Sequence, residues 1–342
     1  MSNSDLVNCM HQWHQPAYRA QQIRQWRNKG ILDPAAMRNL PSPLVETLKQ
    51  KLDCQPVLMM KRELSQDGTR KYLFTLKSGQ MIETVFIPEP DRGTVCISSQ
   101  VGCVFDCPFC HTGTQRFEKN LSAGEIVAQV LGVKFDLIDN PPTTGQFGMV
   151  THVVYMGMGE PLANEDGLKG SLFSLMSQDN LHLSRRRITV STSGIVPAMS
   201  RLGESYPVNL AVSLHAATDE LRDRLVPINR KYPLASLRQC LDSYPLGKQR
   251  HITLEYLMLD GINDSKADLH ALANFVQPAR ERVNLIHFNP YPGNPYHSTP
   301  RSRIDKFAEG LIQNGIRATV RKSRGQDIMA ACGQLKAVSE KN

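Results

Sequence analysis

The feature that most constrains the fold of this chain is an alternation of short β-branched segments with longer helical segments, which begins near residue 94. The short segments predict strands, and apolar residues recur at helical spacing between them. Such repeats favour parallel strands, because a helix carries the chain back to the start of the next strand. The expected strands span residues 94–98, 152–156, 187–191, 208–213, 252–257, 283–288 and 318–321. The expected helices span residues 122–133, 234–243, 265–276 and 302–314.

This pattern predicts an α/β fold, built as a full or partial barrel. In parallel α/β folds the loops at the carboxyl ends of the strands carry the active site, so we expect the functional residues there. One helix start is marked especially clearly, because Ser122 and Glu125 have the spacing of a capping box.

The first part of the chain has a different character. Gln, Arg and Trp are frequent in residues 1–75, and apolar residues recur at helical spacing, which predicts a small helical domain. Strands are expected at 71–76 and 81–86, with Ser78 and Gly79 in the turn between them. We therefore divide the chain into a helical domain (1–75), a strand connection (76–93), a barrel core (94–325) and a C-terminal segment (326–342).

The composition predicts the partners and the cellular compartment of the protein. Forty Lys and Arg against 32 Asp and Glu give a formal net charge of +8, which favours polyanionic partners such as nucleic acid. No apolar stretch approaches the roughly 20 residues that a membrane helix needs, and no signal peptide is visible at the start. We therefore expect a cytoplasmic protein with no membrane partner, whose eight cysteines stay reduced.

Three of the cysteines form a tight cluster directly after the first barrel strand. Cys103, Cys107 and Cys110 have the spacing C-x3-C-x2-C. Three thiolates on one loop can ligate three irons of a four-iron cluster and leave the fourth iron open to a substrate. Other interpretations remain open: a zinc site with His111 as a ligand, a c-type haem at the C-x-x-C-H motif, and buried structural cysteines. The haem is disfavoured because no export signal is visible.

A glycine-rich turn, Gly157-Met-Gly-Glu-Pro161, follows the next expected strand. Its glycines let a ligand approach the backbone closely, and Glu160 offers a carboxylate to a ligand ammonium group. Because the strands are expected to be parallel, this turn and the cysteine loop should lie at the same end of the barrel. Taken alone, the segment is also compatible with an ordinary turn.

With these motifs, residues 18–335 resemble the radical S-adenosylmethionine superfamily, and specifically its RlmN/Cfr family of RNA adenine methyltransferases. Further matches are Ser191-Thr-Ser-Gly194, Ser213-Leu-His215, Val226-Pro-Ile-Asn229, residues 284–290 and residues 321–335. The resemblance implies a partial (β/α)6 barrel similar to a TIM barrel, a [4Fe-4S] cluster on the three cysteines, and two molecules of S-adenosylmethionine per turnover. It also implies the residues that line the cofactor pocket: Gly159, Glu160, Ser191, Ser213, Leu214, His215 and Asn289.

Two isolated cysteines, Cys96 and Cys332, also match the family. An adenine ring carbon at position 2 or 8 is electrophilic and cannot attack the methyl sulfonium directly. The resemblance implies that one cofactor molecule methylates Cys332, and that a 5′-deoxyadenosyl radical from the second removes a hydrogen atom from this methyl group. The carbon radical adds to adenine, and Cys96 then attacks the sulfur of Cys332, which releases the methylated base and forms a disulfide.

Glu83 matches the residue that removes the ring proton, and its alternative is an ordinary strand carboxylate that faces solvent. The remaining isolated cysteines are interpreted as small buried apolar residues: Cys9, Cys54 and Cys240.

The expected substrate is RNA. The segment 289–296 is more similar to the carbon-2 enzymes, which implies methylation at adenine 2503 of 23S rRNA, with adenine 37 of tRNA as a second substrate. The helical domain would hold the RNA, an electron donor such as flavodoxin or ferredoxin would reduce the cluster, and the enzyme would be a monomer. Phosphate contacts are expected from basic residues near strand or helix ends: Arg185, Arg186, Arg187, Arg222, Arg224, Arg230, Lys231, Arg321, Lys322 and Arg324.

Two positions depart from the family pattern. His111 stands where a small residue is usual, and His287 stands where proline is usual. They are consistent with a divergent paralogue. The alternatives to carbon-2 methylation are a carbon-8 (Cfr-like) enzyme, a related radical enzyme with another RNA or a non-RNA substrate, and a non-enzymatic RNA-binding module.

Overall fold

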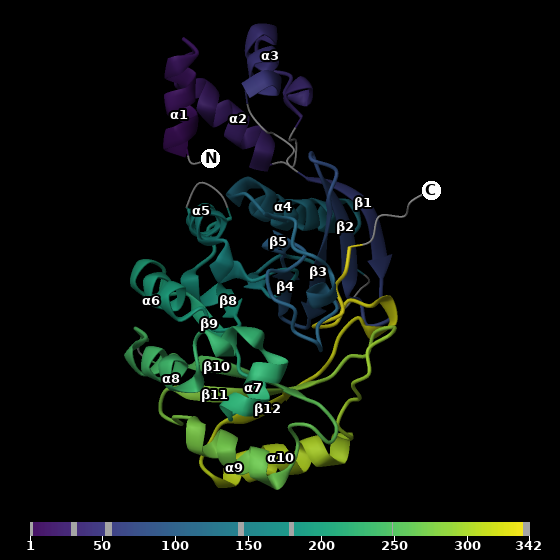
Figure 1. The fold of residues 1–342 in the computed structure, drawn as a ribbon. Helices are drawn as coiled ribbons and strands as arrows, with labels where there is room; N and C mark the ends of the chain where they lie inside the picture. Colours follow the sequence, from purple (N-terminus) through teal and green to yellow (C-terminus); the bar gives the residue numbers. More distant parts are fainter. Residues whose placement is uncertain are drawn as a thin grey trace.

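A computed structural model describes residues 3–28, 33–51, 57–142, 147–177, 181–247 and 249–337. Within these residues ten strands form one curved sheet in the order β1-β2-β3-β4-β7-β8-β9-β10-β11-β12 (Figure 1). The strands are β1 (Val57–Leu64), β2 (Arg70–Leu76), β3 (Met81–Glu89), β4 (Arg92–Cys96), β7 (His152–Tyr155), β8 (Ile188–Thr192), β9 (Asn209–Ser213), β10 (Ile252–Met258), β11 (Glu281–His287) and β12 (Ala318–Arg321).

The sheet has a parallel and an antiparallel part. From β4 to β12 each strand pairs in parallel with the next, whereas β1 to β4 are joined as antiparallel neighbours. The sheet does not close on itself, because β1 and β12 are its edge strands. This arrangement confirms the predicted α/β class and the partial barrel, and all seven expected barrel strands are present with ends shifted by at most two residues.

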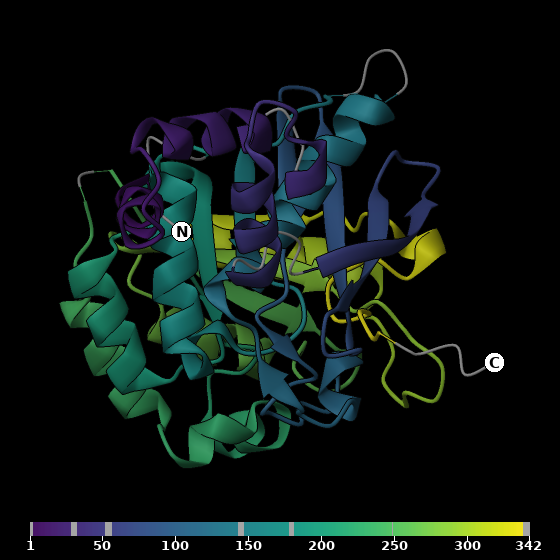
Figure 2. The ribbon, with the colours of Figure 1, turned by 90° about the horizontal axis from the view of Figure 1, so that it is seen from above.

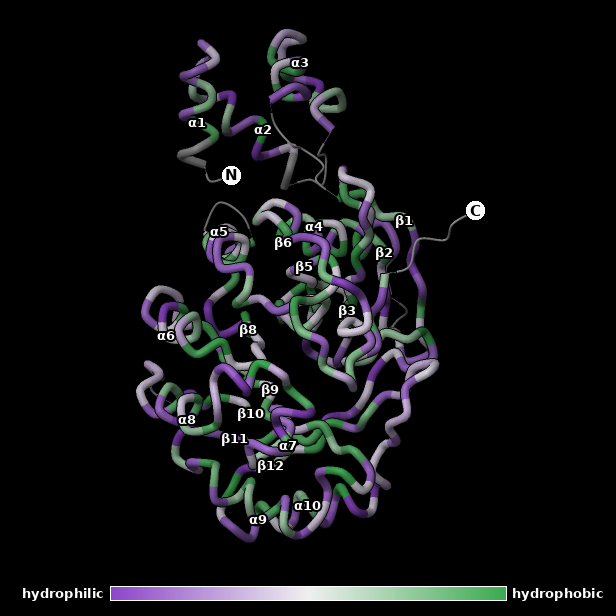
Figure 3. Tube along the Cα trace, in the orientation of Figure 1, coloured by the Kyte–Doolittle hydropathy of each residue, from purple (hydrophilic) through white to green (hydrophobic). Residues whose placement is uncertain are grey.

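Helices cover the outer side of this arc. Figure 1 shows α4 (Ala123–Asp139), α5 (Glu165–Met176), α6 (Val196–Ser205), α8 (Leu234–Ser243), α9 (Lys266–Phe275) and α10 (Arg301–Gln313) following one another along it. The short α7 (Asp219–Leu225) lies near the carboxyl ends of the strands. Apolar and polar residues are interleaved along α6, α8 and α10 (Figure 3). In α10 the buried residues recur at i, i+3, i+4 and i+7, which gives one apolar face toward the sheet: Ile304, Phe307, Ala308 and Leu311.

The N-terminal helices have a separate apolar core. They are α1 (Asn3–Gln12), α2 (Tyr18–Asn28) and α3 (Ser42–Lys51), and their buried residues include Met10, Ile23, Leu44 and Leu48. The helices end at Lys51, and β1 and β2 belong to the large sheet, so the helical domain does not extend to residue 75 as predicted. The strands predicted at 71–76 and 81–86 are confirmed as β2 and β3, and alternate residues of β2 (Tyr72, Phe74 and Leu76) are buried as a strand requires.

The C-terminal segment leaves β12 and passes beside the β1–β3 edge of the sheet, as the yellow chain shows in Figures 1 and 2. The Asp327 carboxylate accepts hydrogen bonds from the Ser65 hydroxyl (2.6 Å) and the Gln66 N–H (3.1 Å) in the turn between β1 and β2. The Lys336 N–H donates to Glu83 on β3 at 2.9 Å. The segment therefore bridges the two edges of the open barrel. In the part of the chain that is described, no helix is long and apolar enough to cross a membrane.

Candidate active site

The loop that carries the cysteine cluster follows β4. It is closed at its base by a two-stranded sheet of β5 (Gln100–Val101) and β6 (Lys119–Asn120). Gly102, just before the first cysteine, has a φ of 70°, and a Cβ there would lie 2.2 Å from the carbonyl oxygen of Arg116. Only glycine fits this close approach, and it turns the loop back over the strand ends.

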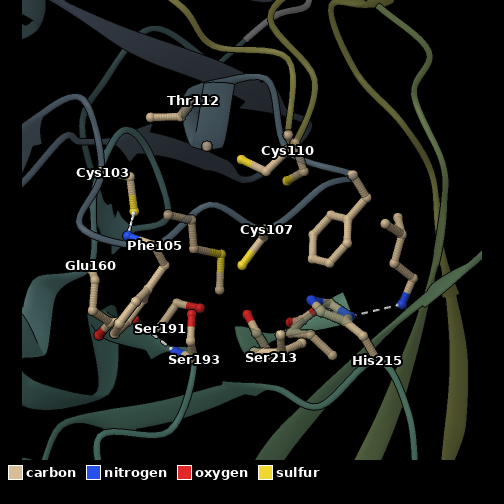
Figure 4. A pocket seen from close by; sticks show the side chains of 18 of the residues that line it. Cys103, Phe105, Cys107, Cys110, Thr112, Glu160, Ser191, Ser193, Ser213 and His215 are labelled. Carbon is tan, nitrogen blue, oxygen red and sulfur yellow. Dashed lines mark hydrogen bonds between the residues drawn. The ribbon is translucent and has the colours of Figure 1, made fainter. Parts of the chain in front are cut away.

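The three thiols of this loop line one pocket at the carboxyl end of the parallel strands (Figure 4). Burial raises the pKa of Cys103 to about 12 and the pKa of Cys107 well above its usual value, and the neighbouring cysteines add to both shifts. Because the three thiols share one pocket, they would repel one another as thiolates, and bound iron ions would relieve this repulsion.

The donors that the structure places together at this end of the barrel are the three thiols of one loop. His111, the alternative zinc or haem ligand, places its Nδ1 3.1 Å from the carbonyl oxygen of Gln334. The donor set therefore fits a multi-iron cluster held by three thiolates.

The glycine-rich turn after β7 forms the next wall of the pocket. Gly159 has a φ of 93°, and a Cβ there would lie 2.4 Å from the Cβ of Gln100 in the cysteine loop. Glu160 is buried and accepts hydrogen bonds from the N–H groups of Leu162 (3.0 Å) and Ser193 (2.8 Å). Burial raises the pKa of this carboxyl group despite these bonds. A ligand ammonium group beside Glu160 would favour its charged form.

The ends of β8 and β9 supply the floor of the pocket. Ser191, Ser213 and His215 line it together with Gly159 and Glu160, as Figure 4 shows for the labelled residues. The His215 Nδ1 accepts a hydrogen bond from the Leu257 N–H at 3.0 Å. Burial, helped by nearby Arg222, lowers the pKa of His215 to about 3. The neutral ring therefore carries its proton on Nε2, which is free to donate.

Two predicted cofactor residues lie elsewhere. Leu214 is fully buried and does not line the pocket. Asn289 lines a neighbouring cavity instead, and its amide donates to the carbonyl oxygen of Cys332 at 3.2 Å. Five of the seven predicted residues therefore surround the pocket directly.

Arg222 does not contact solvent, so its predicted role as a phosphate contact is wrong. Its side chain is fully buried behind the pocket. It donates to the carbonyl oxygens of Ser193 (2.7 Å), Ser213 (3.2 Å) and Leu214 (3.1 Å), and to Asn229 Oδ1 at 2.8 Å. The guanidinium group therefore ties together the ends of two adjacent strands.

Cys332 stands at the boundary between this pocket and a second cavity inside the arc of the barrel. It lines both spaces, as do Met156, Glu255, Ile286 and Arg321. Cys96, at the end of β4, lines only the second cavity. Burial raises the pKa of Cys96 to about 12, and the proximity of Cys332 adds to this shift. The two thiols, 236 residues apart in sequence (332 − 96), are therefore neighbours in the fold.

The second cavity is the larger one, at about 630 Å³ against about 160 Å³ for the cysteine pocket. Charged side chains line it: Glu89, Arg92, Arg282, Lys322 and Arg324. Arg321, predicted as a phosphate contact, lines both cavities together with Cys332. Lys322 and Arg324 keep a position compatible with phosphate binding.

Glu83 is not a solvent-facing strand carboxylate. It is buried on β3, where it accepts the Lys336 N–H and lies 3.4 Å from the Lys71 ammonium group. Burial raises its pKa. It holds the C-terminal segment and lines neither of the two cavities described above.

The structure also shows where the other cysteines and the two histidines that depart from the family pattern lie. Cys240 is buried as expected, Cys9 is only partly buried, and Cys54 lies outside the described residues. Neither histidine lines the two cavities: His287 lies 3.4 Å from Arg301 of α10, and His111 contacts Gln334 in the Cys332 segment.

Sequence reasoning missed several residues of the site. Phe105 and Phe109 line the cysteine pocket, and the Phe109 ring meets His215 edge-on with ring centroids 4.8 Å apart. Their positions between the cysteines were the available signal. Ser193 also lines the pocket, and it was hidden within the matched Ser-Thr-Ser-Gly segment.

Comparison with known proteins agrees with this geometry. The model of the Radical SAM superfamily matches residues 97–273. The dual-specificity RNA methyltransferase RlmN of Methylobacterium radiotolerans is 46% identical, over 94% of this chain and 81% of the relative. The RlmN of Paracoccus denitrificans is also 46% identical, over 96% of this chain and 85% of the relative.

A solved structure is also similar to this chain over nearly its whole length. The radical SAM methyltransferase from Sphaerobacter thermophilus is 41% identical and superposes with a TM-score of 0.91, over 98% of both chains. Since identity of this level extends over nearly the whole chain, the family predicted from the motifs is confirmed, and the chain belongs to the radical SAM superfamily and, within it, to the family of the RlmN methyltransferases.

Proposed function

We propose that this protein methylates carbon 2 of adenine in RNA, at adenine 2503 of 23S rRNA and adenine 37 of tRNA, by way of a methylated Cys332. The observation that carries this proposal is the place of Cys332, which borders both the three-thiol pocket and the cavity that contains Cys96. The relatives named dual-specificity RNA methyltransferases support an RNA substrate of more than one kind.

Membership of the superfamily implies a [4Fe-4S] cluster and S-adenosylmethionine, with two molecules of the latter per turnover in the RlmN family. Cys103, Cys107 and Cys110 would hold the cluster, which supplies the electron that cleaves S-adenosylmethionine. The buried Glu160 carboxylate would receive the ammonium group of the cofactor. The Nε2–H of His215 and the hydroxyl groups of Ser191 and Ser213 would orient the rest of it.

The two thiols would carry the methyl group to the base. The Cys332 sulfur loses its proton and accepts a methyl group, and this methyl group then loses a hydrogen atom and bonds to adenine carbon 2. Glu83 would take up the ring proton, for which its raised pKa is suited. Cys96 loses its proton and attacks the Cys332 sulfur, so that the carbon–sulfur bond breaks and a disulfide forms. The released carbon takes up a proton to become the methyl group, and the one surplus electron of the adduct would return to the iron-sulfur cluster that the three cysteines would hold.

The second cavity would admit the adenine. Its volume of about 630 Å³ falls in the range of roughly 300–1,000 Å³ typical of sites for small molecules. Arg282, Lys322 and Arg324 at its wall would contact the flanking phosphates. A target adenine in folded RNA would have to leave its stack to enter, as in other enzymes that modify bases.

The N-terminal helices would hold more of the RNA. Tyr18 at the start of α2 is 53% exposed, and the Arg19 guanidinium lies 4.8 Å from its ring centroid. An exposed aromatic ring beside a cation is a surface on which a base can stack. Flavodoxin or ferredoxin would supply the electron, and the protein would act as a cytoplasmic monomer.

The direct test is mass spectrometry of rRNA and tRNA from cells with and without the gene. We expect 2-methyladenine to disappear from both RNAs in the deletion strain and to return with the wild-type gene. A lost modification at carbon 8, or unchanged RNA, would contradict the proposal. The reconstituted protein should contain about four irons per chain and should form 5′-deoxyadenosine on reduction.

Substitution of the two thiols tests the route. Cys96→Ala should accumulate a covalent adduct between the protein and RNA, because the methylated base is no longer released. Cys332→Ala should form no adduct and no methylated RNA, although it retains the cluster. Denaturing gel electrophoresis with labelled RNA separates these outcomes, and normal methylation by either variant would refute the mechanism.

A further inference from the structure

Residues 330–337, which carry Cys332, form neither helix nor strand, and the cysteine loop holds them in place. Three consecutive carbonyl oxygens of this segment accept hydrogen bonds from two adjacent residues of that loop. The His111 N–H donates to Gly333 at 2.7 Å, and the Thr112 hydroxyl donates to Leu335 at 2.6 Å. Between them, the His111 ring lies with Nδ1 3.1 Å from the Gln334 oxygen. Because a carbonyl oxygen only accepts, Nδ1 carries the proton of this bond.

The His111 ring also makes a second contact. It stacks on Tyr291, with ring centroids 4.3 Å apart and an interplanar angle of 12°. Tyr291 and Asn294 in turn donate to the carbonyl oxygen of Pro108, at 3.3 and 2.9 Å. The loop after β11 is therefore fastened to the cysteine loop, with the His111 ring at the centre of the junction.

The Cys332 segment also contacts the loop after β11 directly. The Gln334 amide donates to the carbonyl oxygen of Pro290 at 2.8 Å. The cysteine loop, the loop after β11 and the Cys332 segment thus meet at one point, and the His111 side chain contacts the other two. A small residue at position 111, as the family pattern carries, would keep the backbone bond to Gly333 but lose both side-chain contacts.

We propose that His111 is a positioning residue, which holds the Cys332 segment at a fixed distance from the cluster so that cofactor cleavage stays coupled to methyl transfer. This inference rests on the proposed function. Reactions of this kind need the reacting atoms in near contact, and a displacement of about 1 Å can cost up to about 100-fold in rate. A mobile Cys332 would leave the radical to be quenched by another hydrogen donor, so 5′-deoxyadenosine would form without methylated RNA.

The test compares His111→Ala with His111→Phe, which keeps the stacking surface, and His111→Asn, which keeps a hydrogen-bond donor. The measured quantity is the ratio of 5′-deoxyadenosine to methylated adenine. We expect His111→Ala to raise this ratio by about tenfold, and the two conservative variants to fall between it and wild type. His270→Ala, an exposed histidine on α9, is the matched control and should behave as wild type.

Two readouts separate positioning from a general structural role. With deuterium in the Cys332 methyl group, the fraction of 5′-deoxyadenosine that carries deuterium should fall in His111→Ala. Amide hydrogen exchange in residues 333–336 should become faster in the same variant, in the absence of any cofactor. Iron content should stay at the wild-type value, and a loss of iron in all three His111 variants would overturn the inference in favour of a role in holding the cluster.

An unchanged ratio in His111→Ala, with normal methylation by wild type, would refute the inference and leave the proposed function standing. The proposed function fails separately if mass spectrometry of wild-type peptides shows that Cys332 is never methylated.

Discussion

At the scale of single residues, the site depends on buried polar groups that bond largely to backbone atoms. Arg222 is the clearest case, because its guanidinium group is fully buried and bonds to three carbonyl oxygens and one amide oxygen. Removal of such a group leaves buried acceptors without donors, at a cost of roughly 1–3 kcal/mol for each strongly affected group.

Arg222→Met should therefore lower the free energy of unfolding by about 3–5 kcal/mol, because four buried acceptors lose their donor at once. Urea denaturation followed by circular dichroism measures this change. Arg224→Met, on the same short helix but exposed, is the control, and we expect a change below about 0.5 kcal/mol. Equal losses in both variants would contradict the structural role of Arg222.

His215 predicts a dependence of stability on pH. Its pKa is about 3 in the folded protein, against an ordinary value of 6.5. Between these values the unfolded chain binds a proton that the folded chain does not, so stability is lost as the pH falls below 6.5. The expected slope is about 1.4 kcal/mol per pH unit. Denaturation curves between pH 7 and 5 should show a smaller slope for His215→Gln, and identical slopes would argue against the buried neutral ring.

At the scale of elements, the start of helix α4 shows which helix boundary could be predicted from the sequence. The spacing of Ser122 and Glu125 predicted a capping box, and both of its hydrogen bonds are present at the start of α4. Ser122→Ala should lower the free energy of unfolding by about 1 kcal/mol in urea denaturation. Ser184→Ala is the matched control, because Ser184 begins a short helix without making a side-chain cap, and an equal loss there would contradict the assignment.

Three helices were not predicted, each for a physical reason. In α5, Gly167 and Gly170 lower the helix propensity of the segment. Asn164 caps this helix, but Pro161, three residues earlier, makes the same stretch of sequence resemble a turn. In α6 a proline stands near the start and Gly203 near the end, so the segment resembles a loop. The seven residues of α7 are too few for a periodic pattern, and only packing of Leu225 and Arg222 makes them helical.

Motifs in the sequence pointed to the cysteine loop and the glycine-rich turn, because their residue types and spacing carry the chemistry. The two isolated thiols were singled out by the family resemblance alone. The contacts of His111 with Tyr291 and Gln334 could not be predicted, because they join residues 180 and 223 positions apart (291 − 111 and 334 − 111). The same holds for Arg222, whose burial depends on how α7 packs and not on local sequence.

At the scale of the whole molecule, the excess of positive charge gives a prediction about RNA binding. Affinity for single-stranded RNA should fall with salt, because bound phosphates release counterions, with a slope of about −0.7 per contacted phosphate. Lys322→Gln should make the slope of the logarithm of the binding constant against the logarithm of salt concentration less negative by about 0.7, as measured in filter-binding titrations. Lys266→Gln, exposed on the outer helix α9, should leave the slope unchanged, and an unchanged slope for Lys322→Gln would exclude it as a phosphate contact.

The C-terminal segment that bridges the sheet edges has a consequence for biosynthesis. It follows every strand of the sheet in the chain, so it leaves the ribosome after the barrel core has emerged, and domains begin to fold in that order. The cluster loop can therefore fold before Cys332 exists, and the segment then docks on Glu83 and the β1–β2 turn. Under the proposed mechanism, a nascent chain gains the ability to methylate RNA only when this last segment has been made.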